Sequence, residues 1–398
     1  MKTKMLTLLF AAGLTVAAAV PQVSNVAMTQ YGKCKITYTL SEAPGIVTFD
    51  ILTNGVSIGA QNLTNAVGDV NRLVQPGTRA IQWNASKIWP GHKFRTPCVT
   101  AQVTVWPTNE PPDWLAVDLT KADYPVTYYA SEAALPWGSI WENPTYKGDV
   151  MLMRRIPASH VLSFMGSPES EENHLADGRE TRRMCTLTND FYIGIYPMTF
   201  RQFSLLSDPT STEARLSPVV GQSYNMLRYD AVGNYHNAAL PVNFPTTSRT
   251  FVGGDSLIKS WRDRTGLTLD LPTSAQWEFA CRCGTDTPLY NGPHTMVNLN
   301  LISDAYHANY EVGQRGSNGW HLFDMIGNVY EWCLDYFEVN IPADAVTDPL
   351  GPASHPQIAR KIRGYHAMLV HRRAAFFTDS VYTTQQGDIG FRLCITLP

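Results

Sequence analysis

Two histidines near the carboxyl end of the chain could take part in metal chemistry. His366 and His371 flank Met368, and both imidazole and thioether groups can bind copper. The histidines are five positions apart, so in an extended strand their side chains would point to opposite faces of the sheet. We therefore expect surface or packing histidines here, with a metal site as the alternative.

The chain contains seven cysteines, and one close pair among them favours a structural role over redox chemistry. Cys281 and Cys283 form a C-x-C pair at the expected end of a helix. Redox pairs are usually C-x-x-C at a helix start, where the dipole lowers the pKa of the thiol, and a helix end acts in the opposite sense. Cys34 and Cys98 are either a disulfide or two buried thiols. The odd total leaves at least one cysteine without a partner in the chain.

Two short helices can be placed from their capping signals. Thr273 can cap a helix, and Gln276 stands three residues later, as in a capping box. A second helix is expected over 199–206, with Thr199 as its cap. The rest of 150–398 is rich in glycine, proline and aromatic residues, which predicts a loop-rich unit around these helices.

Residues 23–107 have the pattern of a small β-domain. Runs at 33–40 and 46–52 alternate polar and apolar side chains, as half-buried strands do. Two more strands are expected at 80–85 and 98–106, with turn signals between the runs. Several short strands over about 85 residues suggest an immunoglobulin-like sandwich.

Residues 108–149 are expected to form a linker or an irregular segment. Proline and polar residues dominate at 107–114, a composition typical of linkers, and one strand is expected within 124–129. Residues 150–398 follow as a third block. These expectations place the chain in the α+β class, with an immunoglobulin-like sandwich before a loop-rich domain.

Residues 1–19 match the pattern of a secretory signal peptide. Lys2 and Lys4 precede an apolar run at 6–20, and small residues at 17–19 suit a signal peptidase. An uncleaved membrane anchor is the alternative, although the run is short for a span of about 20 residues. We expect an exported protein, either periplasmic or secreted to the cell envelope.

The charge balance bears on the class of partner. The chain has 31 Lys and Arg against 34 Asp and Glu, for a net charge of −3. Proteins that bind nucleic acids need a basic excess to neutralise phosphates, so no nucleic-acid partner is expected. No stretch after the amino-terminal run is long and apolar enough to suggest a membrane span after signal cleavage.

Motifs in the third block resemble the sulfatase-modifying-factor, or formylglycine-generating enzyme, family. Residues 271–282 read LPTSAQWEFACR, similar to the family's LPTEAEWEYA helix. Residues 319–332 read GWHLFDMIGNVYEW, similar to its GLYDMxGNVWEW motif. Residues 390–392 match its terminal GFR strand, and residues 363–364 match the start of its RGGSW strand. The resemblance implies a mixed α/β domain with little regular secondary structure, related to C-type lectins.

The resemblance also carries an expectation about chemistry. The family's founding activity oxidises a sulfatase cysteine to formylglycine, with copper held by two cysteines between the RGGS and GFR strands. The corresponding interval, 363–391, contains no cysteine, and soft thiolates are what Cu(I) requires. Copper is therefore not expected, and we expect a non-catalytic member. The alternative is a formylglycine-generating-type oxidoreductase with altered active-site residues.

A member without the thiols could still use the family's groove, which holds an extended peptide. The residues expected near it here are Tyr365, His366, His371, Arg372 and Arg373, and the expected ligand is a peptide, a protein or a glycan. A third interpretation is a lectin-fold display protein with a hypervariable segment over 365–386.

The resemblance further implies a calcium site in the GNVxEW segment, built from main-chain carbonyls and a glutamate. The matching residues are Ile326, Gly327, Asn328, Val329 and Glu331. Hard Ca²⁺ requires several oxygen ligands at once. The alternative is a buried Glu331 that only forms hydrogen bonds to the surrounding loop.

Overall fold

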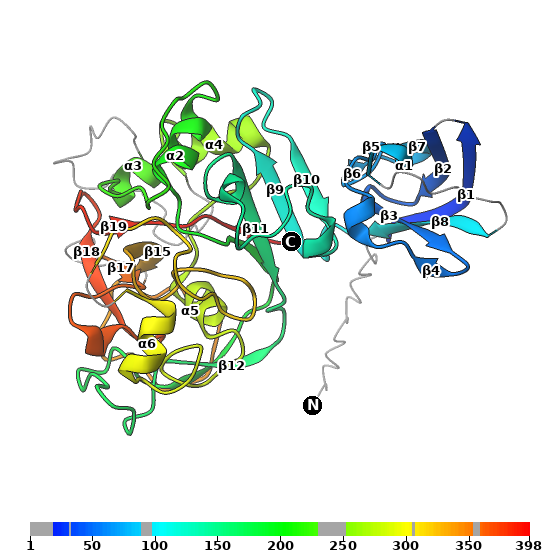
Figure 1. The fold of residues 1–398 in the computed structure, drawn as a ribbon. Helices are drawn as coiled ribbons and strands as arrows, with labels where there is room; N and C mark the ends of the chain where they lie inside the picture. The colour runs from blue at the N-terminus through cyan, green and yellow to red at the C-terminus, as the bar shows by residue number, and fades with distance from the viewer. Residues whose placement is uncertain (1–18, 32, 89–97, 230–251, 305–306, 353–358) are drawn as a thin grey trace, which may run out of the picture.

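The computed structural model describes residues 19–31, 33–88, 98–229, 252–304, 307–352 and 359–398. Figure 1 shows a small all-β unit at the amino-terminal end and a larger mixed unit that holds the rest of the chain. All but the last residue of the expected signal peptide lies outside the described residues. In the described part of the chain, no helix has the length and apolar character needed to cross a membrane.

The amino-terminal unit consists of two antiparallel sheets around a shared core. One sheet has the order β1 (Gln22–Tyr31), β2 (Lys33–Ser41), β7 (Gly77–Trp83) and β5 (Val67–Gly68). In the other, β3 (Gly45–Thr53) pairs with β4 (Val56–Ser57), β6 (Arg72–Val74) and β8 (Val99–Trp106). Side chains from both sheets meet inside, among them Ile36, Val47, Ile51, Ile81 and Trp83.

The four expected strands are present in this unit, and the expected run at 80–85 ends earlier, at Trp83. The chain then forms the short helix α1 (Ala85–Ile88), and the 3₁₀ turn η1 (Ala60–Asn62) precedes β5. Cys34 is buried, Cys98 is exposed, and both are free thiols. A bridge between them is therefore not formed. The immunoglobulin-like topology itself remains a prediction.

Residues 108–149 differ from the expected linker, because they contain two strands of the second unit. The sheet has the order β10 (Val126–Tyr129), β9 (Trp114–Asp118), β11 (Val150–Ile156), β14 (Phe191–Gly194) and β20 (Cys394–Thr396). The expected strand at 124–129 corresponds to β10. Four consecutive residues of β9 are buried, so this strand lacks the alternation that would have revealed it. Two turns, η2 (Glu132–Ala134) and η3 (Pro144–Lys147), complete the segment.

Two smaller sheets support the carboxyl-terminal loops. One has the order β12 (Leu162–Met165), β13 (Arg183–Thr186) and β16 (Val346–Thr347). The other has the order β18 (Phe377–Val381), β17 (Ala359–Arg363), β15 (Tyr330–Tyr336) and β19 (Ile389–Gly390). The helices are α2 (Phe200–Ser207), α3 (Tyr224–Arg228), α4 (Leu257–Thr265), α5 (Ser274–Arg282) and α6 (Met296–Ile302).

Both helices expected from capping signals are confirmed. Thr199 caps α2 and Thr273 caps α5, and each forms a full capping box with the glutamine three residues later. Cys283 ends α5 in the left-handed conformation. The capping signals therefore fix where α5 begins, and that helix carries much of the core.

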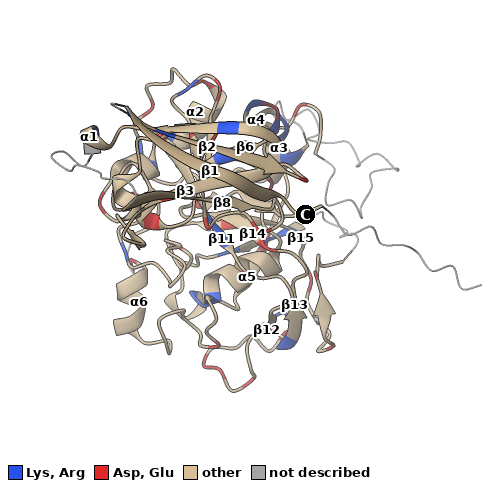
Figure 2. Cartoon of the chain, turned by 90° about the vertical axis from the view of Figure 1, so that its right-hand side faces the viewer, with Lys and Arg blue, Asp and Glu red and all other residues tan. Residues whose placement is uncertain are grey.

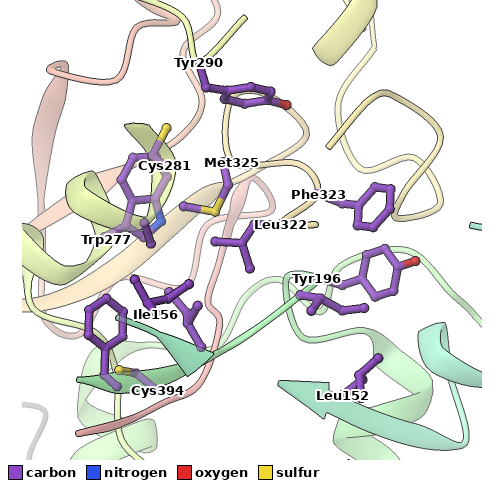
Figure 3. Close-up of a cluster of buried hydrophobic side chains, with 14 of the residues drawn as sticks. Leu152, Ile156, Tyr196, Trp277, Cys281, Tyr290, Leu322, Phe323, Met325 and Cys394 are labelled. Carbon is purple, nitrogen blue, oxygen red and sulfur yellow. The ribbon is translucent and has the colours of Figure 1, made fainter. Parts of the chain in front are cut away.

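A large apolar cluster joins α5 to the five-stranded sheet. Figure 3 shows Trp277 and Cys281 of α5 in the same cluster as Met325, with Ile156 and Cys394 below them. Their side chains are almost fully buried, and burial of this kind is the main favourable term in folding. Cys281 therefore occupies a packing position, in line with the structural role expected for it, and Cys394 packs in the same cluster.

Charged residues are sparse on the amino-terminal strands. Figure 2 views the molecule from that side, and blue and red segments there are scattered among tan ones. The visible strands carry no run of a single charge sign along their length.

Candidate functional site

Arg363 marks the point where the chain leaves β17 and the candidate site begins. Its buried guanidinium donates to Ser274 Oγ at 2.7 Å, to Ala374 O at 2.9 Å and to Glu278 Oε2 at 2.8 Å. Gly364 follows with φ of 96°, and a Cβ there would lie 3.3 Å from the Trp277 ring. Since positive φ and close approach both favour glycine, the RG pair fixes the exit of the chain against α5.

His366 and His371 lie side by side, contrary to the expectation that they face opposite ways. Their ring centroids are 4.8 Å apart, and both rings pack on Phe376, at 5.1 and 4.9 Å. The expectation assumed an extended strand, whereas the chain turns back through η4 (Leu369–His371). The Met368 amide donates to His366 Nδ1 at 3.0 Å, which holds this turn.

Both imidazoles are biased toward their neutral forms. Burial lowers the pKa of His366, and the neighbouring His371 and Arg372 act in the same direction. Burial also lowers the pKa of His371, with Arg373 adding to the effect. His371 Nδ1 is buried and has no hydrogen-bond partner among the described residues. A neutral imidazole donates a hydrogen bond through one ring nitrogen and accepts one through the other.

Arg372 lies inside the protein beneath the Tyr365 ring. Its guanidinium carbon is 4.7 Å from the ring centroid. It donates to Ser303 Oγ at 3.0 Å, to the carbonyl of His366 at 2.9 Å, and to the carbonyl of Asp304. These bonds hold the loop, so Arg372 is an internal support and its guanidinium is not exposed.

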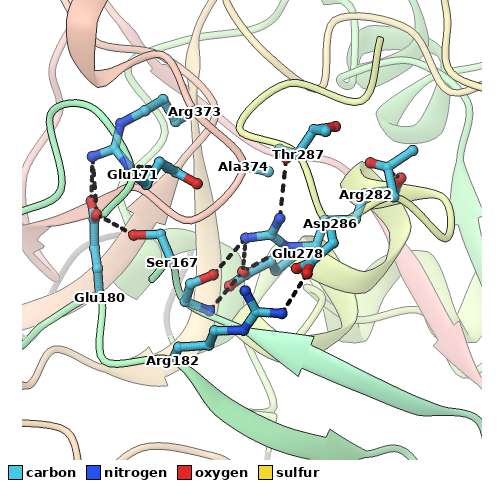
Figure 4. Close-up of polar contacts among 12 residues, drawn as sticks. Ser167, Glu171, Glu180, Arg182, Glu278, Arg282, Asp286, Thr287, Arg373 and Ala374 are labelled. Atoms are coloured by element: carbon cyan, nitrogen blue, oxygen red, sulfur yellow. Dashed lines mark hydrogen bonds and ion pairs between the residues drawn. The ribbon is translucent and has the colours of Figure 1, made fainter. Parts of the chain in front are cut away.

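Arg373 is also internal, in a buried charge network. It donates to Glu171 at 2.6 Å and to both oxygens of Glu180, at 2.8 and 2.9 Å. Ser167 Oγ donates to the same Glu180 carboxylate at 3.0 Å, as Figure 4 shows. Removing one partner of a buried ion pair leaves the other charge buried and uncompensated. Arg373 therefore has a structural role. The partly exposed members of the expected set are Tyr365, His366 and His371.

The GNVxEW segment is buried, and its glutamate has side-chain partners. Glu331 accepts two hydrogen bonds of 2.7 Å from Arg392 and one of 2.8 Å from the Trp277 indole. The expected alternative was a Glu331 that forms hydrogen bonds only within its loop. It needs revision, because the partners of Glu331 are Arg392, just before β20, and Trp277 of α5. Ile326, Gly327, Asn328 and Val329 line the same buried turn.

Asp324 is a residue that the sequence reasoning missed at this turn. Its Oδ1 atom and the Oδ1 atom of Asn328 are both buried without a hydrogen-bond partner in the described structure. Its Oδ2 atom accepts from the Gly313 amide at 2.7 Å. Burial raises the pKa of Asp324 to about 6. The signal was present in the sequence, as an acidic residue four positions before Asn328.

These oxygens are the right kind of ligands for a hard cation. In the described residues no three His, Cys, Asp or Glu side chains gather into a metal-binding group. A calcium ion here would therefore need Asp324, the Asn328 amide oxygen and main-chain carbonyls, with Glu331 already bound by Arg392. The donor set fits calcium on this basis, and the site remains a prediction.

Four buried cysteines of the second unit are poorly suited to form thiolates. Burial raises the pKa of Cys185 and Cys281 to about 12, and it raises the pKa of Cys333 and Cys394 as well. A thiolate is the form that acts as nucleophile and metal ligand. At neutral pH these four side chains behave as small apolar groups of the core.

Comparison with known families decides the scaffold. Residues 155–397 match the sulfatase-modifying factor enzyme 1-like domain. The chain belongs to this family. The formylglycine-generating enzyme of Mus musculus is 25% identical over 307 residues, which cover 66% of this chain and 79% of that protein. The enzyme of the same name from Streptomyces coelicolor is 31% identical over 162 residues, which cover 33% of this chain and 50% of that protein.

Solved structures similar to this chain include PvdO and a variable protein of Treponema denticola. PvdO from Pseudomonas aeruginosa has a TM-score of 0.48 and 19% identity, and covers 62% of this chain and 95% of its own. Treponema denticola variable protein 1 has a TM-score of 0.44 and 21% identity, with the same two coverages. The family match begins within β11, so β1 to β10 lie before the matched domain in this sulfatase-modifying-factor-family protein.

Proposed function

We propose that this protein is an exported, non-catalytic member of the sulfatase-modifying-factor family. It binds a peptide or glycan through the surface formed by Tyr365, His366 and His371. The two arginines next to this surface act as its internal supports. Export rests on the signal-peptide pattern at 1–19.

The observation that carries the non-catalytic proposal is the composition of the interval between Arg363 and Phe391. It contains no cysteine, so the soft ligand pair that Cu(I) requires has no counterpart there. The buried cysteines elsewhere have raised pKa values, as described above for Cys281. Their thiols would be poor substitutes as copper ligands.

The ligand surface is supported by its mixture of aromatic and polar groups. The rings of Tyr330 and Tyr365 are perpendicular, with centroids 5.4 Å apart, and the centroids of His366 and Tyr330 are 6.3 Å apart. Aromatic side chains with a polar end give large contact areas at low entropic cost. Neutral imidazoles beside them would add directional hydrogen bonds without attracting anions strongly.

Two measurements on the purified mature protein test the absence of oxidase activity. Copper content is determined by elemental analysis, and oxygen consumption is followed with a cysteine-containing sulfatase peptide. We expect far less than one copper per chain and no peptide-dependent oxygen consumption. Stoichiometric copper together with turnover would overturn the proposal in favour of the oxidoreductase alternative, in which the His366 and His371 pair could contribute ligands.

Binding is tested with peptide and glycan libraries, followed by titration of the best probe. Tyr365→Ala and His366→Ala should each weaken binding by tenfold or more, because each removes a partly exposed side chain from the proposed contact surface. His160→Asn is the matched control, since His160 is exposed, lies at φ of 59°, and asparagine tolerates that conformation. A probe whose affinity is equal in all four proteins would show that this surface is not the binding site.

A further inference from the structure

A cavity of about 250 Å³ lies between the amino-terminal unit and the second unit. One wall is the outer face of the β3 and β8 pair, and the other is the segment from Ala130 to Ala134, which ends in η2. The two units are tied at its edge, because the Tyr128 amide donates to the Asn71 carbonyl at 2.8 Å. Figure 1 shows β3 and β10 on the facing sides of the two units.

The β-strand register places polar groups side by side on the first wall. Asp50 is directly opposite Gln102, and Thr48 is directly opposite Thr104, which brings each pair of Cβ atoms to within about 5.5 Å. Trp106 follows on the same face of β8, and its indole donates to Thr48 Oγ1 at 2.9 Å. A carboxylate, an amide, a hydroxyl and an indole therefore share one surface.

The Asp50 carboxylate is held in place and retains one free oxygen. Its Oδ1 atom accepts from the Ile51 amide at 2.7 Å and from Ser57 Oγ at 3.0 Å. Its Oδ2 atom has no hydrogen bond to any residue in the described ranges. An oriented carboxylate of this kind can accept two hydroxyl groups of a ligand.

The lining chemistry restricts the class of ligand. None of the described residues that line the cavity is a lysine, an arginine or a histidine. An anionic ligand would therefore meet Asp50 without a compensating charge. A purely apolar ligand would leave the amides and hydroxyls unpaired, which costs free energy.

A neutral sugar satisfies both restrictions. Its hydroxyl groups donate and accept hydrogen bonds, matching Asp50, Gln102 and Thr104, and its C–H face can pack on the Trp106 ring. The volume is below the roughly 300–1,000 Å³ of sites for drug-sized ligands, so it suits one ring and not a chain of them. We propose that this cavity binds a single neutral hexose unit, either as a free sugar or at the end of a glycan.

The site is independent of the surface at Tyr365 and His366. Its walls belong to two units, so an occupied cavity would also hold the two units together. Ligand binding should therefore raise the melting temperature of the full mature chain.

The test uses the full mature protein and the methyl glycosides of glucose, galactose, mannose and N-acetylglucosamine, titrated by calorimetry. At least one should bind, and Asp50→Asn and Gln102→Ala should each weaken it tenfold or more. Ser131→Trp fills the cavity from the opposite wall and should abolish binding without altering the sandwich. Gln82→Ala changes an exposed glutamine on β7 outside the cavity and should leave the affinity for the glycoside unchanged.

Oligosaccharides that carry the preferred hexose either at the end or in the interior distinguish a free sugar from a glycan end as the natural ligand. Binding of the free glycoside alone indicates a free sugar, and equal binding of the terminal form indicates a glycan end. Failure of all four glycosides to bind would overturn the proposal, as would binding that Ser131→Trp leaves intact. Tighter binding of tetramethylammonium than of every glycoside would also overturn it, by assigning the cavity to a cation. Circular dichroism confirms that each variant is folded.

Discussion

Asp324 is the residue whose burial has the clearest consequence for stability. Its pKa is raised from 3.8 to about 6 by burial, so the folded state favours the protonated form. The stability that the protonated Asp324 carboxyl gives to the folded state is fully present below pH 4, and it is lost as the pH rises through about 6. The shift corresponds to about 3 kcal/mol at most.

We expect Asp324→Asn to remove this pH dependence. In the presence of EDTA, the free energy of unfolding of the wild type should fall between pH 4 and pH 7 relative to that of the variant. Urea denaturation at several pH values measures the difference. Added calcium should restore the stability of the wild type above pH 6, because the metal favours the ionised carboxylate, and should stabilise the variant less. Parallel curves for the two proteins would contradict the assignment.

The sequence identified the residues of the candidate site but not which of their side chains are buried. Arg373 was expected beside the ligand surface, yet its partner Glu180 is 193 positions away in the chain. No local pattern indicates which carboxylate approaches an arginine over that separation. Tyr365 and His366 remain at the surface, so the candidate site keeps part of its expected membership.

At the scale of elements, the cap of α5 supports both the core and the site. Thr273 Oγ1 accepts from the Gln276 amide at 3.0 Å, and Gln276 accepts from the Thr273 amide at the same distance. We expect Thr273→Ala to lower the free energy of unfolding by about 1–2 kcal/mol, because the buried backbone N–H of Gln276 loses its acceptor, Thr273 Oγ1. Thr273→Ser keeps the hydroxyl and is the control. Equal losses in the two variants, measured by chemical denaturation, would show that packing of the methyl group matters more than the cap.

Elements with local signals were predictable, and the others were not. Capping residues and alternating strands act through neighbours in sequence, which is why α2, α5, β2 and β3 were found. In contrast, β9 has four consecutive buried residues, so its side chains do not alternate between buried and exposed positions. The turn at η4 brings the two histidines together, and the rings of His366, before the turn, and His371, within it, both pack on Phe376.

At the scale of the whole molecule, the position of the boundary between the two units can be tested by truncation. A chain of residues 108–398 should be soluble and unfold cooperatively, because it retains β9 and β10. A chain of residues 150–398 should aggregate, because removing β9 exposes the edge of β11 and the neighbours of buried Leu115 and Val117. Size-exclusion chromatography and thermal melting compare the two. Equal behaviour would restore 108–149 to the role of a linker.

The sequence by itself determined the family scaffold, the two capped helices and the absence of cysteine between Arg363 and Phe391. These features depend on residue identity and on spacing along the chain. The tertiary structure decided which arginines are internal, that His366 and His371 are neighbours, and that Asp324 has an unpartnered oxygen. It also decided that a polar cavity forms between two units. Burial and charge pairing arise from contacts between distant segments, and such contacts leave no periodic trace in the sequence.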